Sequence, residues 1–162
     1  RVLDLTRIYS GPYCTFLMAM AGAEVIKVEP PEGESARKRD AREGAALPFA
    51  MLNVNKRLLT LNMKDKRGAQ IFTELVKTAD VLVENFRPGV MARLKLGWDD
   101  LRAIRSDLVY CAISGFGQEG ALKDNPAAPA PPVALSDSAA RLARLQQLQV
   151  GSDWHPTQMP PG

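Results

Sequence analysis

Residues 1–31 read RVLDLTRIYSGPYCTFLMAMAGAEVIKVEPP and determine the fold that we expect. Residues 1–6 alternate apolar and polar side chains as a β-strand does, and residues 11–23 open on Gly-Pro and continue as an apolar, helix-compatible run. Residues 24–29 alternate again, until Pro30 and Pro31 end the strand because proline cannot continue a hydrogen-bonded ladder. The stretch therefore predicts a β-α-β unit.

The alternation of strand-like and helix-like segments continues to about residue 117. The pattern predicts strands over 58–63, 80–85 and 107–117 and helices over 64–79 and 89–105, the second helix being broken near Gly97. In residues 64–79 we expect Ile71, Leu75 and Val76 to share the buried face. Strands separated by helices of this length predict an α/β fold with a Rossmann-like, doubly wound parallel sheet.

Two segments do not fit this alternation. Residues 32–44, EGESARKRDAREG, are charged and poor in apolar side chains, so we expect a surface loop. From residue 126 onward the chain is rich in proline, and a single short helix is expected after Ser136 or Asp137 as the N-cap. The sequence therefore predicts two regions, an incomplete sheet domain over residues 1–125 and a divergent, irregular Pro-rich tail over residues 126–162.

Composition excludes several classes of protein. The 162 residues, 46% hydrophobic and 24% charged, are typical of one globular domain, and the net charge of +3 is spread along the chain, which favours a small anionic ligand over nucleic acid. The two cysteines form no CxxC pair and the chain has a single histidine, so we expect no metal site and a reducing cytoplasm. No apolar run reaches about 18 residues, so we expect no membrane segment. The chain begins on arginine rather than methionine, which leaves the natural start open.

Polar residues gather where the predicted strands end. In a doubly wound sheet, ligands bind beyond the carboxyl ends of the strands, and these ends carry TRIYSGP, NMK, ENFRPG and SGFGQEG. Lys64, Arg87 and Arg93 could pair with phosphates there, with Asn85 on the same ligand-facing loop, while Phe86 would lie against an adenine or cap the core. The alternative for Lys64 and Arg93 is that they are solvated charges at helix ends.

Four blocks of the sequence resemble one family. VLDLTRIYSGPYCTFLMAMAGAEVIKVEPP, NVNKRLLTLNMK, ADVLVENFRPGVMARLKLGWDDL and LVYCAISGFGQEG are similar, in this order, to the amino-terminal part of the class III CoA-transferases of the CaiB/BaiF type. The resemblance covers about residues 1–125 and implies the first part of a large Rossmann-like domain. It also implies CoA contacts from Tyr9, Ser10, Leu61, Lys64, Asn85, Phe86, Arg87 and Arg93. Pro30 stands where some members carry a basic residue, which weakens the CoA contact implied at that position.

The family's chemistry requires an aspartate nucleophile. The resemblance implies transfer of CoA from an acyl-CoA thioester to a carboxylic acid through an aspartyl intermediate, with no tightly bound cofactor, in interlocked homodimers. The family's aspartate follows the glycine block after a segment like PAYD, whereas NPAAPAP stands at residues 125–131 here. Asp137 has a superficially similar context but suits a helix N-cap. We therefore assign no catalytic residue and expect this chain alone to be inactive, as a truncated or rearranged form.

Two alternative functions remain open. The racemase branch of the same family moves an α-proton and carries a segment like GHD after the glycine block, which this sequence lacks. A non-catalytic nucleotide-binding module of another Rossmann type would be expected to show G-x-G-x-x-G after the first strand, where SGPYCTF has one glycine. The CoA-transferase function is therefore favoured over both.

Overall fold

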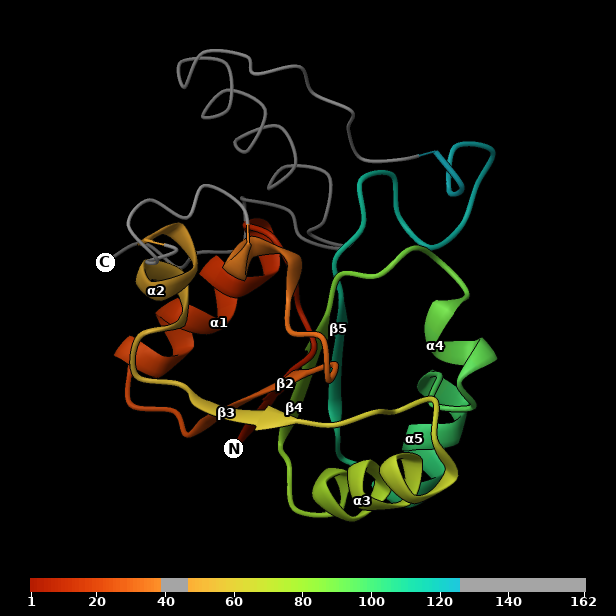
Figure 1. The fold of residues 1–162 in the computed structure, drawn as a ribbon. Coiled ribbons are helices and arrows are strands. Elements are labelled where there is room, and N and C mark those ends of the chain that lie inside the picture. The colour runs from red at the N-terminus through yellow and green to blue at the C-terminus, as the bar shows by residue number, and fades with distance from the viewer. Residues whose placement is uncertain (39–46, 126–162) are drawn as a thin grey trace, which may run out of the picture. The chain divides into compact units, whose positions relative to one another are not determined.

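The computed structural model describes residues 1–38 and 47–125. The chain divides into two compact units, Arg1–Ser114 and Gly115–Gly162. In the first unit the described residues form one five-stranded sheet in the order β3-β2-β1-β4-β5, and every neighbouring pair is parallel (Figure 1). The strands are β1 (Val2–Asp4), β2 (Val25–Glu29), β3 (Arg57–Thr60), β4 (Val81–Glu84) and β5 (Val109–Ala112). The predicted doubly wound parallel sheet is therefore confirmed.

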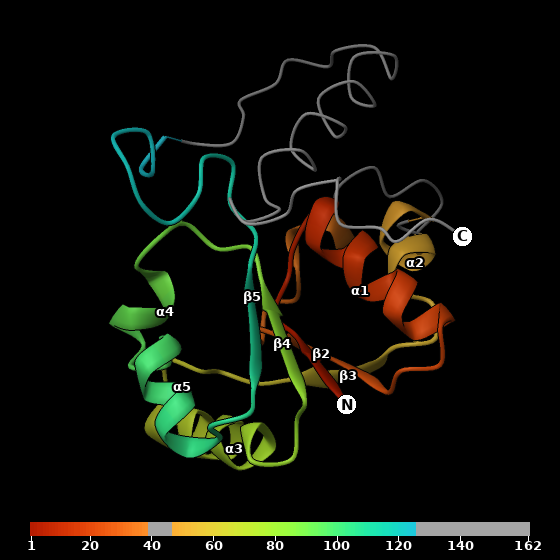
Figure 2. The ribbon, with the colours of Figure 1, turned by 180° about the vertical axis from the view of Figure 1, so that it is seen from behind.

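Helices cover both faces of the sheet. The helices are α1 (Ser10–Met20), α2 (Leu47–Asn53), α3 (Lys66–Val76), α4 (Val90–Arg93) and α5 (Trp98–Ile104), with a 3-10 helix, η1, at Ser35–Arg37. Helices α1 and α2 lie on one side of the sheet and α3, α4 and α5 on the other, as Figures 1 and 2 show from opposite directions. This placement follows from right-handed crossovers that run from β1 outward to β3 and then return to β4.

The sheet buries different side chains on its two faces, because successive residues of a strand point to opposite sides. The face covered by α3, α4 and α5 carries the larger apolar cluster, formed by Leu3, Leu5, Val28, Leu61, Phe72, Val76, Ala79, Leu82, Met91, Leu96, Leu101 and Leu108. The α1 face carries a smaller cluster of Val2, Ala19, Val25 and Val83. Most of the apolar packing that holds the described sheet together therefore lies on the α3–α5 side.

Helix α3 buries Val76 as predicted, and Leu75 packs half-buried against the larger apolar cluster, but one predicted core residue is exposed. Its buried residues are Gly68, Phe72 and Val76, whereas Ile71 is 43% exposed, so the assignment of Ile71 to the core was wrong. The reason lies at the start of the helix, where Gly68 packs so closely that a Cβ there would lie 2.0 Å from the carbonyl oxygen of Asn62. This contact sets the rotation of α3, and the positions four and eight residues further on then face the sheet.

The charged segment after β2 is not a plain surface loop in its described part. Glu34 is 2% exposed and Ala36, in η1, is 6% exposed, so these two residues depart from the expected surface loop, whereas Glu32, Ser35, Arg37 and Lys38 are exposed as expected. Residues 39–44 of that segment lie outside the described residues. Helix α2 was not predicted either, because seven residues are too few to show a helical period. The predicted break near Gly97 is confirmed, since α4 ends before it and α5 begins after it, where Asp100 Oδ2 accepts the Gly97 N–H at 3.0 Å.

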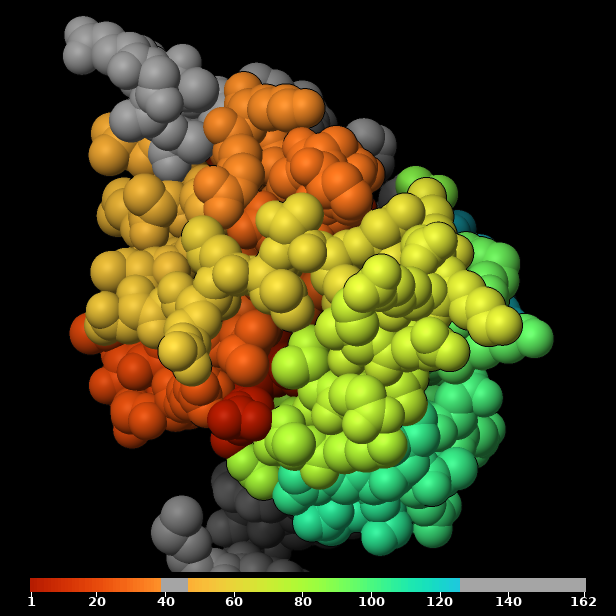
Figure 3. Space-filling model, turned by 60° about the horizontal axis from the view of Figure 1, so that its bottom comes forward, coloured from red at the N-terminus to blue at the C-terminus, as the bar shows by residue number. Residues whose placement is uncertain are grey.

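The amino ends of the strands meet at the surface shown in Figure 3, where the red amino terminus lies between the orange-red of α1 and the yellow-green of α3. The Arg1 side chain donates to Glu24 at 2.9 Å and to Thr78 at 2.8 Å, and Arg57 also donates to Glu24 at 2.8 Å. Exposed ion pairs of this kind contribute little to stability, yet they give each of these arginines a partner.

Residues 115–125 form turns without a regular helix or strand. The helix predicted after Ser136 or Asp137 lies outside the described residues.

Candidate active site at the carboxyl edge of the sheet

The chain reverses its direction of winding between β1 and β4. These strands are neighbours in the sheet, but β1 leads into α1 on one face and β4 leads into α4 on the other. Such a topological switch point is where open α/β sheets bind their ligands, beyond the carboxyl ends of the strands. The two loops that leave this point, residues 5–9 after β1 and residues 85–89 after β4, therefore form the centre of the candidate site.

The loop after β1 is held by side chains from its own strand and from both neighbouring strands. Asp4 Oδ1 accepts the Thr6 N–H at 2.8 Å, and the Lys27 ammonium of β2 donates to the Thr6 carbonyl at 2.8 Å. The Asn85 side chain, after β4, accepts the Arg7 N–H at 2.7 Å and donates to the Arg7 carbonyl at 2.8 Å. We predicted Asn85 as a CoA contact. In the structure, its side-chain oxygen and nitrogen both form hydrogen bonds to the backbone of the β1 loop.

Phe86 caps the core and also supports a cation. Its ring packs against the larger apolar cluster, and the Arg7 guanidinium lies over it with its carbon 5.0 Å from the ring centroid. The Phe86 N–H donates to the buried Glu84 carboxylate at 2.6 Å, and the Tyr110 hydroxyl donates to the same group at 3.2 Å. Burial raises the pKa of Glu84, because these two hydrogen bonds compensate only partly for the lost hydration. In the described structure Phe86 thus caps the core, with the Arg7 guanidinium over its ring.

The remaining predicted site residues fall into two groups, one buried residue and five exposed ones. Leu61 is 8% exposed and belongs to the larger apolar cluster, against which the half-buried Met63 of the same segment also packs. Exposed side chains are contributed by Tyr9 and Ser10 at the start of α1, by Lys64 after β3, and by Arg87 and Arg93 around α4. Within residues 1–38 and 47–125, the side chains of Lys64, Arg87 and Arg93 have no hydrogen-bond or ion-pair partner.

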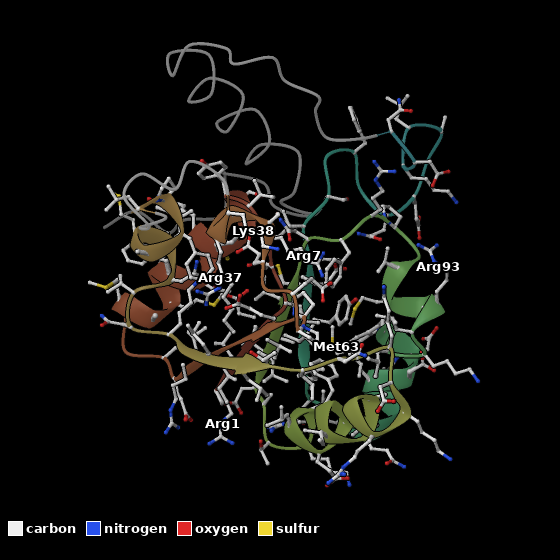
Figure 4. All side chains as sticks on the ribbon, in the orientation of Figure 1. Arg1, Arg7, Arg37, Lys38, Met63 and Arg93 are labelled. Atoms are coloured by element: carbon white, nitrogen blue, oxygen red, sulfur yellow. The ribbon has the colours of Figure 1, made fainter. Side chains whose placement is uncertain are left out.

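Sequence reasoning missed three charged residues near this edge. Arg7 and Lys38 are exposed; in Figure 4 they lie near the centre, with Arg93 apart from them on the α4 side, and all three lie above Arg1. Glu34 is buried, and its Oε1 accepts the Ile8 N–H at 2.8 Å. Arg7 follows the first strand directly, so the rule that ligands bind at strand ends would have identified it. No local pattern marks Glu34 as buried.

A buried ionic network lies beneath the same edge on the α1–α2 face. The Lys56 ammonium donates to Asp4 Oδ2 at 2.9 Å, to Thr15 Oγ1 at 2.8 Å, to the Pro12 carbonyl at 2.9 Å and to Asn53 Oδ1 at 2.9 Å, and the side chains of Lys56 and Asp4 are both 0% exposed. Burial lowers the pKa of Lys56, and the Asp4 carboxylate opposes that effect. With every neighbour satisfied, this network has no group left for a ligand, so we assign it a structural role.

The described residues contain no group of three or more His, Cys, Asp and Glu side chains that could hold a metal ion. In the same ranges, no helix is long and apolar enough to cross a membrane.

Comparison with known proteins identifies the family. The sequence model of CoA-transferase family III matches residues 1–136. The chain belongs to CoA-transferase family III. Among curated members of this family, the formyl-CoA:oxalate CoA-transferase of Streptomyces coelicolor is 48% identical over 120 residues, which are 73% of this chain and 29% of that protein. The enzyme of the same name from Rhodopseudomonas palustris strain BisA53 is 47% identical over 120 residues, 72% of this chain and 28% of its own length.

Solved structures place the fold in the same family. The crystal structure of the hypothetical protein Rv3272 from Mycobacterium tuberculosis superposes with a TM-score of 0.76 at 33% identity, over 91% of this chain and 47% of that one. A CaiB/BaiF family protein from Brucella suis superposes with a TM-score of 0.73 at 36% identity, over 77% of this chain and 35% of its own. The chain spans less than a third of the length of the two curated formyl-CoA:oxalate CoA-transferases named above, 29% of one and 28% of the other.

Proposed function

We propose that this chain is the amino-terminal part of an acyl-CoA:carboxylate CoA-transferase and that it holds the CoA moiety at the carboxyl edge of the sheet. The observation that supports this proposal is a contrast between the two ends of the sheet. At the amino end, Arg1, Arg57 and Arg105 each pair with a carboxylate. At the carboxyl edge, Arg87 and Arg93 have no such partner within the described residues. An anionic ligand would supply the missing partner, and CoA carries three phosphate groups.

The proposed contacts follow the switch point. Lys64, Arg87 and Arg93 would pair with phosphates by charge-assisted hydrogen bonds, Tyr9, Ser10 and Leu61 would border the ligand, and Asn85 and Phe86 would act mainly by fixing Arg7. In the whole enzyme, an aspartate outside residues 1–125 would attack the acyl-CoA thioester and release the CoA thiolate, forming a mixed anhydride. The thiolate would then attack the aspartyl carbonyl, releasing the first acid and leaving aspartyl-CoA for the acceptor acid.

The substrates and setting of the whole enzyme are part of the same proposal. The curated relatives are named for formyl-CoA and oxalate, so we propose an acyl-CoA with a short acyl group and a small carboxylic acid as acceptor. We further propose an interlocked homodimer in the cytoplasm as the working form. This chain alone, without the aspartate, is expected to bind CoA but not to transfer it.

Calorimetric titration of free CoA into the chain tests the proposed site. Arg93→Ala is expected to weaken binding by about 1 to 3 kcal/mol, the usual cost of losing a hydrogen bond to a charged group. The control is Arg57→Ala, which removes another exposed arginine, at the amino end of the sheet, and should leave affinity unchanged. Circular dichroism must show that all three proteins are folded. Absence of heat from the folded wild type, or equal losses in both variants, would remove the CoA site.

A further inference from the structure

One residue of the β1 loop has an unfavourable backbone conformation. Ile8 has a φ of 69°, in the left-handed region, where a β-branched side chain is a clear outlier. Its side chain is 37% exposed, so packing of the isoleucine does not explain the conformation. Strain of this kind persists only where surrounding contacts fix the backbone.

Those contacts act on a single peptide unit. The carbonyl of Arg7 and the N–H of Ile8 belong to the same planar, trans peptide, so they point in opposite directions. Asn85, from the β4 side, donates to the carbonyl at 2.8 Å, and Glu34, from the β2 side, accepts the N–H at 2.8 Å. The peptide is therefore clamped across β1 from both neighbouring strands, and its orientation fixes the ψ of Arg7 and the φ of Ile8 together.

Glu34 is itself buried, and two backbone N–H groups hold one of its carboxylate oxygens, while the other makes no hydrogen bond within the described residues. It is 2% exposed, its Oε1 also accepts the Ala36 N–H at 3.3 Å, and its Oε2 lies 3.5 Å from the Lys27 ammonium. Lys27 is 0% exposed and also donates to the Thr6 carbonyl, two residues before Ile8. One lysine thus aligns both the carboxylate and the loop that the carboxylate holds.

We propose that Glu34 is a positioning residue of the coenzyme site, which holds Ile8 in the left-handed conformation and thereby fixes Arg7 and Tyr9 on either side of it. This inference rests on the proposed CoA site. Glu34 makes no contact with the ligand in this scheme. If the Glu34 oxygen that accepts the Ile8 N–H is lost, we expect Ile8 to relax to a negative φ. The peptide between Arg7 and Ile8 then rotates, and the side chains of Arg7 and Tyr9 move away from the site.

A matched pair of variants isolates the acceptor. Glu34→Gln and Glu34→Met have similar shapes and both remove the charge facing Lys27, but only glutamine retains an oxygen for the Ile8 N–H. Glu34→Met is expected to bind CoA about 3- to 10-fold more weakly than Glu34→Gln, as the loss of one hydrogen bond implies. Adding Ile8→Gly to Glu34→Met should recover most of that loss, because glycine adopts a positive φ without strain.

A measurement without ligand separates this inference from the proposed function. Hydrogen exchange of the Ile8 amide, followed by NMR, should be slow in Glu34→Gln and fast in Glu34→Met. If the folded wild type fails to bind CoA, the proposed function falls, while the exchange rates still test the clamp. Equal exchange rates in the two variants, or no recovery by Ile8→Gly in a chain that binds CoA, would overturn the role of Glu34. Should either variant fail to fold, Glu34→Gln and Glu34→Met can be compared in a Lys27→Met background. In that background the buried Lys27 ammonium, which would otherwise lose its partner, is absent.

Discussion

The two faces of the sheet use the same strands in different ways. Toward α3, α4 and α5, β1 and the residue after it present Leu3 and Leu5, which are both buried in the larger apolar cluster. Toward α1 and α2, β1 presents Val2 and then Asp4, and β2 presents Val25 and then Lys27, all buried. On this second face both β1 and β2 change from an apolar to a charged side chain within two residues, in the direction of the candidate site.

The two faces therefore have different roles: the apolar face stabilises the sheet, and the partly charged face positions the β1 loop. The apolar face holds the sheet together, because area removed from water stabilises it without requiring a precise geometry. The charged ends of the other face make directed hydrogen bonds to the loop after β1, through Asp4 to Thr6 and through Lys27 to the Thr6 carbonyl. A buried network of this kind specifies one arrangement, so the polar half of the core positions the loop that borders the proposed ligand.

Breaking the ionic network should have the largest effect on stability. Lys56→Met leaves the buried Asp4 carboxylate without its cation, and loss of one partner of a buried pair costs about 3 to 5 kcal/mol. The double variant Asp4→Asn/Lys56→Met should recover a large part of this loss, since no buried charge remains. Urea unfolding followed by circular dichroism measures both free energies.

The control for this experiment is Lys77→Met, which removes a lysine that is 52% exposed and paired only with Glu74. Its effect should stay within about 0.5 kcal/mol. A Lys56→Met variant as stable as Lys77→Met would mean that the two faces do not differ in the way described.

Truncation on the apolar face should follow, with a strong dependence on position. Phe72 is 0% exposed, and Phe72→Ala is expected to destabilise the chain by about 3 to 4 kcal/mol through lost burial and the cavity left behind. Ile71→Ala, one residue earlier on the exposed side of α3, should cost less than about 1 kcal/mol. Thermal or urea unfolding of the pair tests the rotation of the helix, and equal losses would contradict it.

The smallest expected effect is a difference in titration between two buried carboxyl groups. Burial raises the pKa of Glu84, which has no cation beside it. For Glu29, burial also acts upward, but the bonds from Arg37 and from the Glu34 N–H outweigh it and lower the pKa. The contribution of Glu84 to stability should therefore decrease as the pH rises above the ordinary glutamate pKa of about 4.3, and that of Glu29 should be lost as the pH falls through its lowered pKa.

NMR titration of the side-chain carboxyl carbons checks this order directly. In unfolding measurements, Glu84→Gln should flatten the dependence of stability on pH between about pH 4.5 and neutrality. If Glu84 titrates below Glu29, the contrast between an unpaired and a paired carboxylate in this core is wrong.

Much of the fold could be predicted from the sequence because strand and helix periods alternate clearly in residues 1–31 and 58–113. The predicted strands and the break near Gly97 are all present. On α3, Val76 was predicted correctly, but the exposure of Ile71 was not, since it depends on how closely Gly68 packs against Asn62, six residues earlier. Helix α2 was missed because it is short and follows a charged segment.

The candidate site could be predicted only where residues lie at strand ends. The edge that bears Asn85 and Arg87 follows from topology alone. The role of Asn85 as a clamp on Arg7 does not, because it depends on the distance between two loops that are 78 residues apart. The burial of Lys27 could have been predicted, since strands of a parallel sheet are covered on both faces. No sequence pattern predicts the hydrogen bond between Glu34 and Ile8.

Lys27 and Lys56, with side chains 0% exposed, differ chemically from the other lysines of the described chain. An amine-reactive acylating reagent needs a free, accessible amine, so the exposed Lys64 should be modified at once, whereas Lys27 and Lys56 should react only when the α1–α2 side of the sheet opens. Their labelling, followed by mass spectrometry of the peptides, would then proceed at a rate set by the population of the open state. The network that holds the β1 loop thus contains two natural reporters of its own opening, without any added probe.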